Sequence, residues 1–86
     1  MIMEIFEKIE LCEQSIVFQI QYFKNELAAT PIQSKENISI ENRMKKRLNL
    51  EMSILHGILK DLSNKMQRDE IWSQYCDVPF DKFRPV

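Results

Sequence analysis

One stretch of the chain, Ile40 to Met66, repeats apolar residues at the spacing of a single helix face. An apolar residue stands at every third or fourth position, over about seven turns of an α-helix. The pattern predicts a second helix over about residues 39–76, with Ser39 or Asn37 as its N-cap and Pro79 as the stop. The row consists of Ile40, Met44, Leu48, Met52, Leu55, Leu59, Leu62 and Met66.

The N-terminal third carries a similar apolar row and predicts a first helix over about residues 3–29. A second, shorter row lies on roughly the opposite side and consists of Leu11, Phe18 and Tyr22. A helix that is apolar on two sides needs two neighbours, and its own chain supplies one. Residues 18–22 also alternate with the period of a β-strand, but the residues on both sides keep the helical period.

The scarcity of turn-forming residues excludes an all-β fold. The 86 residues include one Gly and three Pro, whereas a sheet of short strands needs many tight turns. Pro31 interrupts the helical pattern among turn-favouring Thr, Ser and Asn residues. We therefore expect one all-α domain over residues 1–86: a long, antiparallel, coiled-coil-like hairpin with a connection at 30–38 and an irregular aromatic tail at 77–86.

The charge distribution suggests how the two helices pair. Residues 1–33 carry five Glu against two Lys, whereas residues 34–76 carry eight Lys or Arg against six acids. An antiparallel fold about residues 30–38 brings together residues whose numbers sum to about 69. This register pairs Glu4 with Lys65, Lys8 with Asp61, and Glu26 with Arg43, although exposed ion pairs contribute only about 0–1 kcal/mol each.

The same register leaves an aromatic overhang, because residues after about 68 have no partner in the first helix. The overhang folds back over the hairpin, is covered by a second chain, or serves as a docking surface. We expect a homodimer that forms a four-helix bundle, with the second face of the first helix and the region of Trp72 at the interface. The candidate partner-binding residues are Phe18, Tyr22, Trp72, Tyr75, Phe80 and Phe83.

One basic run offers an alternative site. Arg43, Lys45, Lys46 and Arg47 place four cations within five helical residues, and such a cluster could contact phosphates of RNA or DNA. The simpler interpretation is a solvated helix face, because no aromatic or Gly residues are interleaved with the cations.

No residue set predicts catalysis, a metal site or a cofactor. By the predicted register His56 lies near Cys12 and Glu13, but structural zinc usually takes four ligands and a Cys nucleophile needs an oxyanion site. The Glu residues of the first helix spiral around it and do not converge. A chain with one Gly cannot build a glycine-rich phosphate loop, and no catalytic motif is present.

The sequence predicts a cytoplasmic location and an interaction role. The start of the chain lacks a signal-peptide pattern, and the longest uncharged window, Gln14–Phe23, is too short to span a bilayer. Usage rich in Ile, Lys and Asn suggests a bacterial or phage origin. We expect a small non-enzymatic protein-interaction module of the regulator, inhibitor or chaperone type, with no small-molecule substrate. The alternative is a dimeric helical RNA- or DNA-binding regulator.

Overall fold

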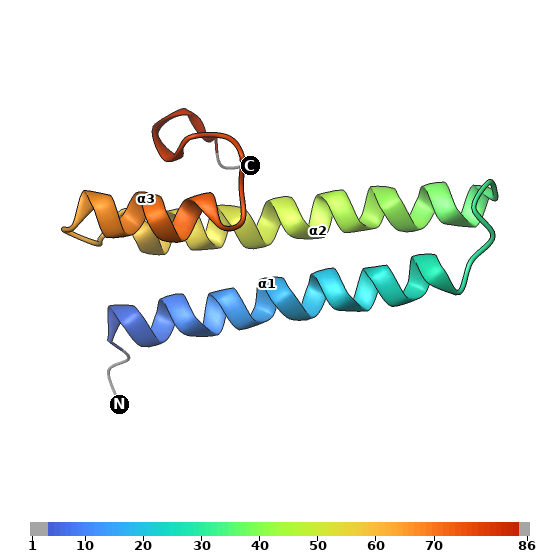
Figure 1. Cartoon of the computed structure of the whole chain (residues 1–86), viewed down its shortest axis with the longest axis horizontal. Coiled ribbons are helices and arrows are strands. Elements are labelled where there is room, and N and C mark those ends of the chain that lie inside the picture. Colours follow the sequence, from blue (N-terminus) through green and yellow to red (C-terminus); the bar gives the residue numbers. More distant parts are fainter. Residues whose placement is uncertain (1–3, 85–86) are drawn as a thin grey trace.

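The computed structural model describes residues 4–84, which form three α-helices and one turn of 3₁₀-helix (Figure 1). α1 spans Ile5–Ala28, α2 spans Lys35–Leu59, α3 spans Lys65–Ser73, and the 3₁₀ turn η1 spans Phe80–Lys82. No strand occurs within this range, so the all-α prediction is confirmed and the strand interpretation of residues 18–22 is wrong.

α1 and α2 pack against each other as the predicted antiparallel hairpin (Figure 1). α1 closely matches the predicted range, although its predicted start at Met3 lies outside the described residues. At its C-terminal end, the Thr30 hydroxyl donates a hydrogen bond to the Glu26 carbonyl at 2.9 Å. This bond satisfies a helix-end carbonyl just before Pro31, which disfavours further helix.

The connection is shorter than predicted, and the predicted N-caps of α2 are wrong. Ser34 is the cap, because its hydroxyl oxygen accepts a hydrogen bond from the Asn37 N–H at 3.1 Å. Glu36 then lies in the first turn, where a carboxylate suits the positive end of the helix dipole. Asn37 and Ser39, the predicted caps, are therefore helical residues, and the non-helical connection reduces to residues 29–34.

One of the three ion pairs predicted between the helices is present. Glu26 and Arg43 form it at 3.4 Å. The other two predicted pairs, Glu4 with Lys65 and Lys8 with Asp61, do not form in the described part of the chain.

The prediction of one continuous helix over residues 39–76 is also wrong, because the chain turns between α2 and α3. Asp61, Ser63 and Asn64 favour turns, and the Asn64 side chain caps α3 by accepting a hydrogen bond from the Gln67 N–H at 3.0 Å. Met66, which continues the apolar row in the sequence, is 84% exposed on α3. The turn instead brings Trp72 back onto the hairpin.

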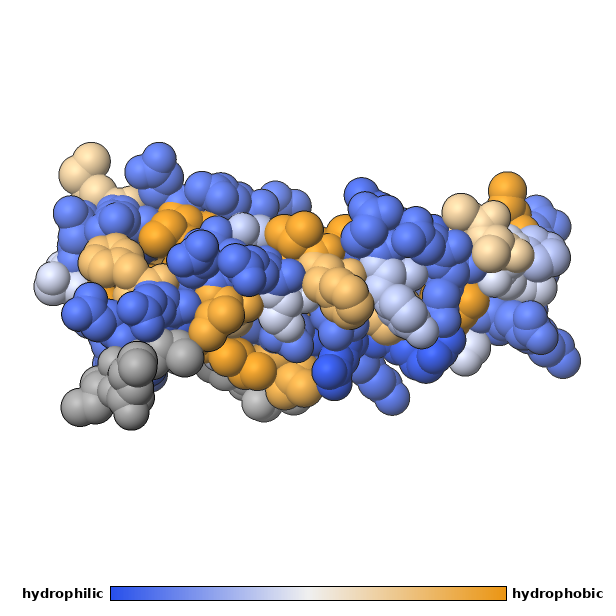
Figure 2. Space-filling view, turned by 90° about the horizontal axis from the view of Figure 1, so that it is seen from below, coloured by the Kyte–Doolittle hydropathy of each residue, from blue (hydrophilic) through white to orange (hydrophobic). Residues whose placement is uncertain are grey.

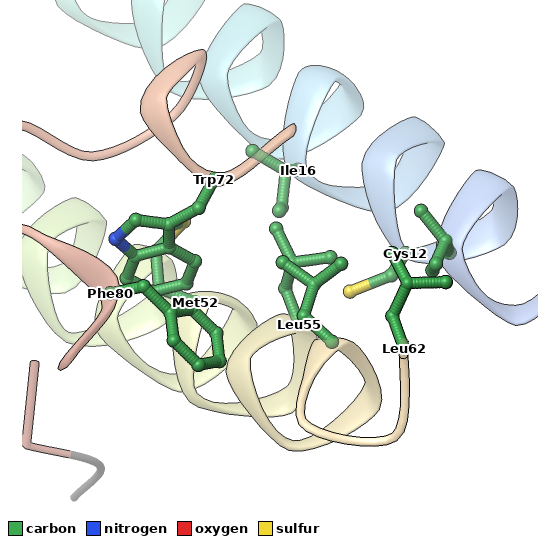
Figure 3. Packing of buried hydrophobic residues seen from close by; sticks show 9 residues of the cluster. Cys12, Ile16, Met52, Leu55, Leu62, Trp72 and Phe80 are labelled. Carbon is green, nitrogen blue, oxygen red and sulfur yellow. The ribbon is translucent and has the colours of Figure 1, made fainter. Parts of the chain in front are cut away.

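The core lies where α3 and the tail cover the α1–α2 pair. Four side chains, Ile16, Leu55, Leu59 and Trp72, are essentially inaccessible to solvent. Figure 3 shows the Trp72 indole and the Phe80 ring beside Met52, with Ile16 and Leu55 adjacent. Of the three alternatives for the aromatic overhang, folding back over the hairpin is therefore the one observed.

Candidate interaction surfaces

The outer row of α1, defined by Leu11, Phe18 and Tyr22, stays exposed in the folded chain. The spacing of seven and four residues places the three side chains on one stripe, away from the buried side chains of the same helix. Phe18 is 65% exposed, and its ring stacks on Tyr22 with the centroids 6.5 Å apart. Tyr22 also meets the buried Phe23 ring edge-on at 5.4 Å.

A second exposed apolar pair, Leu50 and Ile54, lies on α2. Ile54 precedes His56 by two residues and therefore points about 200° away from it around the helix. Since the tail covers His56, Ile54 faces the opposite side of the hairpin. Leu11 is likewise two residues from Glu13, and Glu13 contacts Tyr75 just after α3. Leu11 therefore also points away from the side that α3 and the tail cover. We call this uncovered side, with Leu11, Tyr22, Leu50 and Ile54, the open face.

The aromatic residues of the tail region, predicted to bind a partner, mostly pack against other residues of the same chain. Trp72 is 2% exposed, and its indole N–H donates a hydrogen bond to the Val78 carbonyl at 2.7 Å. Phe80 is buried against Trp72 and His56, whereas Tyr75 and Phe83 are partly buried. Among the six candidate partner-binding residues, only Phe18 and Tyr22 are exposed.

Tyr75 connects the end of α3 to α1. Its hydroxyl donates a hydrogen bond to Oε2 of Glu13 at 2.6 Å. Burial, and secondarily this bond to Glu13, raise the pKa of Tyr75 to about 12. The side chain thus links the segment just after α3 to α1.

A shallow hollow of about 540 Å³ lies on α1 beside the outer row. Figure 2 views the molecule from the side of α1 and shows apolar patches among the polar surface. Glu10 and Glu13 supply negative charge, while Val17 and Phe18 supply apolar surface. The residues that line this acidic hollow are Glu10, Glu13, Gln14, Val17 and Phe18.

The basic cluster of α2 is exposed at all four positions, Arg43, Lys45, Lys46 and Arg47. Of these four cations, only Arg43 forms an ion pair within residues 4–84, with Glu26. The helical spacing gathers Arg43, Lys46 and Arg47 on one side, where with Phe23 and Leu50 they line a basic hollow of about 370 Å³. Lys45 lies about 200° from Arg47 and points elsewhere.

The possible trio of Cys12, Glu13 and His56 does not come together. The Cys12 thiol donates to the Glu51 carbonyl at 3.8 Å, Glu13 is bonded to Tyr75, and His56 contacts the tail. Burial, followed by the nearby Glu51 and Glu13 charges, raises the pKa of Cys12 to about 11, so the thiol stays protonated at neutral pH. Among residues 4–84, no group of three His, Cys, Asp or Glu residues could hold a metal ion.

A cleft of about 430 Å³ opens between the end of α2, α3 and the tail, and three cations line it. We call it the tail cleft. It is lined by His56, Lys60, Arg68, Phe80, Asp81, Phe83 and Arg84.

Comparisons with protein-family models, curated proteins and solved structures give no significant match to the chain. Among residues 4–84, none of the helices combines the length and the hydropathy that a membrane span requires.

The sequence analysis missed the tail cleft, because it depends on the turn between α2 and α3. A single helix over residues 39–76 contains no such turn and does not bring Arg68 toward Arg84 in the tail. The local signal was the run Asp61-Leu62-Ser63-Asn64, which combines three turn-favouring polar residues with a potential cap. A break there would have indicated that α3 folds back and brings Arg68 toward the tail.

Proposed function

We propose that the protein is a small, non-enzymatic interaction module of the regulator, inhibitor or chaperone type, and that it acts as a homodimer. The observation that carries this proposal is the open face. Four large side chains, Leu11, Tyr22, Leu50 and Ile54, remain about half exposed although α1 and α2 are already packed together. Scattered apolar residues are ordinary on a surface, but these four share one side of a two-helix layer.

Charge favours a second copy as the occupant of this face. The segment that contains α1 is acidic, and the segment that contains α2 is basic. A two-fold axis parallel to the hairpin would place α1 of one chain against α2 of the other, so opposite charges meet at both contacts. The result is a four-helix arrangement that buries the open face. The sequence pattern predicts the region of Trp72 at this interface, but Trp72 is buried against residues of its own chain.

Light scattering on the purified protein tests the dimer. The expected mass is twice the 10.3 kDa of the chain. Ile54→Glu places a charge in the proposed interface and should give a monomer that keeps its helical circular dichroism. Ile32→Glu is the matched control, because Ile32 lies in the connection and is 87% exposed. A wild-type monomer at high micromolar concentration would refute self-association and leave the open face for a different protein.

The acidic hollow is the surface that such a dimer would present to a target protein. Glu13 points about 200° away from Leu11, so the acidic side of the hollow lies away from the open face. Phe18, which stacks on Tyr22, forms the border between the hollow and the open face. Its chemistry suits a target segment that inserts an apolar side chain between Lys or Arg residues. Phe18, a rigid aromatic at the edge of the hollow, is the expected anchor residue.

Two synthetic amphipathic helical peptides test this surface, one with Leu and Lys and one with Leu and Glu. We expect fluorescence anisotropy to detect binding of the Lys peptide only, with strong loss in Phe18→Ser. Ile32→Ser serves as the control and should bind as the wild type does. Equal binding of both peptides, or equal loss in both variants, would show that the hollow does not select a basic target.

The alternative function is nucleic-acid binding through the side of α2 that carries Arg43, Lys46 and Arg47. The supporting observation is that Lys46 and Arg47 are exposed and make no ion pair within the described residues. This function predicts binding to duplex DNA or RNA that weakens steeply with salt and is lost in Lys46→Glu/Arg47→Glu. Lys45→Glu should have a smaller effect, because Lys45 points to another side. Absence of binding at low salt would eliminate this alternative.

A further inference from the structure

Three positively charged side chains from separate parts of the chain line the tail cleft. Lys60 follows α2, Arg68 belongs to α3, and Arg84 follows η1. Only one acid, Asp81, lines the cleft with them. Cations that converge in a concave site repel one another unless an anion neutralises them, so the fold creates a positive local field at this position.

The Arg68 side chain is only 13% exposed in this cleft. Its guanidinium carbon lies 4.1 Å from the centroid of the Phe80 ring, and its nitrogens contact Asp69 at 2.9 Å and Asp81 at 3.5 Å. These two carboxylates more than offset the single charge of Arg68. Lys60 and Arg84 form no ion pair within residues 4–84 and are therefore the cations free to bind a ligand.

His56 adds a buried polar group to the wall of the cleft. It is 7% exposed, and its Nε2 lies 3.0 Å from the Phe80 carbonyl oxygen. Because a carbonyl only accepts, Nε2 carries the proton. The other ring nitrogen, Nδ1, is buried and has no hydrogen-bond partner among the described residues. In this tautomer Nδ1 can only accept a hydrogen bond and is inaccessible to solvent, so it makes no contact with an anion in the cleft. The cations of the cleft therefore carry the argument for a ligand.

We propose that the tail cleft binds a small phosphorylated ligand, with Lys60 and Arg84 contacting the phosphoryl oxygens. The volume of about 430 Å³ falls within the usual range for small-molecule sites. Arg and Lys recognise phosphate through short, charge-assisted hydrogen bonds. Phe83 offers an apolar wall beside the cations for the organic part of a phosphomonoester. This site is separate from the open face and the acidic hollow, and it is independent of the proposed interaction function.

Titrations followed by amide chemical shifts test the site in the full-length chain. The probes are inorganic phosphate, adenosine monophosphate and adenosine. We expect both phosphorylated probes to shift the signals of Lys60, Phe83 and Arg84, and adenosine to have no effect. Tighter binding of the monophosphate than of phosphate would identify a phosphomonoester as the ligand, and equal affinity would identify inorganic phosphate.

Variants decide whether these cations form the site. Lys60→Gln and Arg84→Gln should each raise the dissociation constant about tenfold, as expected for the loss of one charge-assisted hydrogen bond. Both positions are exposed, so the fold should be retained. Lys46→Gln, in the basic hollow, is the matched control and should bind as the wild type does. The proposal is overturned if no probe binds at millimolar concentration, or if the control loses as much affinity as the two cleft variants.

Discussion

The His56 ring stacks on the Phe80 ring with the centroids 4.1 Å apart, while its Nε2 donates a hydrogen bond to the backbone carbonyl of the same Phe80. The Arg68 guanidinium lies 4.1 Å from the centroid of that phenyl ring. The imidazole and the guanidinium cannot both occupy the same face of the Phe80 ring at this distance. The Phe80 ring therefore lies between His56 and Arg68. A residue far along the chain is thereby fixed to α2 through both its side chain and its backbone.

Substitution of His56 should separate these two contributions. His56→Ala removes the stacking and the hydrogen bond, and we expect it to lower the free energy of unfolding by about 3 kcal/mol. His56→Phe keeps an aromatic ring and loses only the hydrogen bond, so a loss of about 1 kcal/mol is expected. Urea denaturation followed by Trp72 fluorescence measures both. Equal losses would show that stacking contributes nothing.

Tyr75 should make stability fall at high pH. Its pKa is raised from 10 in a free chain to about 12 in the folded protein by burial and by the hydrogen bond to Glu13. Below pH 10 the hydroxyl is protonated in both states, and its contribution is fully present. Between pH 10 and 12 the unfolded chain loses this proton first, so the contribution decreases as the pH rises.

The variant Tyr75→Phe isolates this effect from the titration of Cys12. At pH 7 we expect the variant to be about 1–2 kcal/mol less stable than the wild type, because the bond to a carboxylate is lost. The difference between the two proteins should shrink from pH 10 to pH 12 in denaturation experiments. A difference that stays constant across this range would mean that Tyr75 does not hold its proton in the folded state.

The two cysteines should react at different rates. Cys12 is buried, and its pKa is raised to about 11, whereas Cys76 is only partly buried. Alkylation by iodoacetamide requires the thiolate and access to it. We expect one thiol, Cys76, to be modified in the native protein, and Cys12 only after denaturant is added. Mass spectrometry of peptides identifies the modified residue, and fast labelling of Cys12 would contradict the packing of α1 on α2.

The hairpin was predictable from the sequence because its two apolar rows are long and regular. Burial of Ile9, Ile16, Leu55 and Leu59 follows directly from their spacing. The turn after Leu59 was not predictable from periodicity, because Leu62 and Met66 continue the same spacing. Leu62 is buried in the turn itself, whereas Met66 is exposed, so one row contains residues of different structural roles.

The candidate site was predictable only in part. Phe18 and Tyr22 stand on a second row of α1, which the spacing places outside the contact with α2. That the row stays exposed depends on α3 and the tail folding over the other side of the hairpin. The position of Trp72 and Phe80 depends on tertiary packing: the Trp72 indole N–H needs a partner when buried, and the Val78 carbonyl provides it only after the tail turns back. Contacts of this kind leave no periodic signal.

Gly57 should be replaceable by Ala with a gain in stability. It lies within α2, is exposed, and has no positive φ that would require Gly. A Cβ at this position would meet no atom within 4 Å. We expect Gly57→Ala to raise the free energy of unfolding by about 0.5–1 kcal/mol, the difference in helix propensity. A loss of stability would reveal a contact at this position that one chain alone does not make, such as a dimer interface.

Asn64 should be the residue that sets the start of α3. Its side-chain oxygen accepts a hydrogen bond from the Gln67 N–H at 3.0 Å, and α3 is only nine residues long. A helix this short is not stable by itself, so its cap and its packing through Trp72 must hold it together. We expect Asn64→Ala to cost about 1 kcal/mol and Asn64→Asp to be nearly neutral, because Asp keeps the acceptor oxygen. Thermal unfolding monitored by Trp72 fluorescence compares the variants. If Asn64→Ala were instead as stable as the wild type, the turn at residues 60–64 would be held by the burial of Leu62 and Trp72 rather than by the cap.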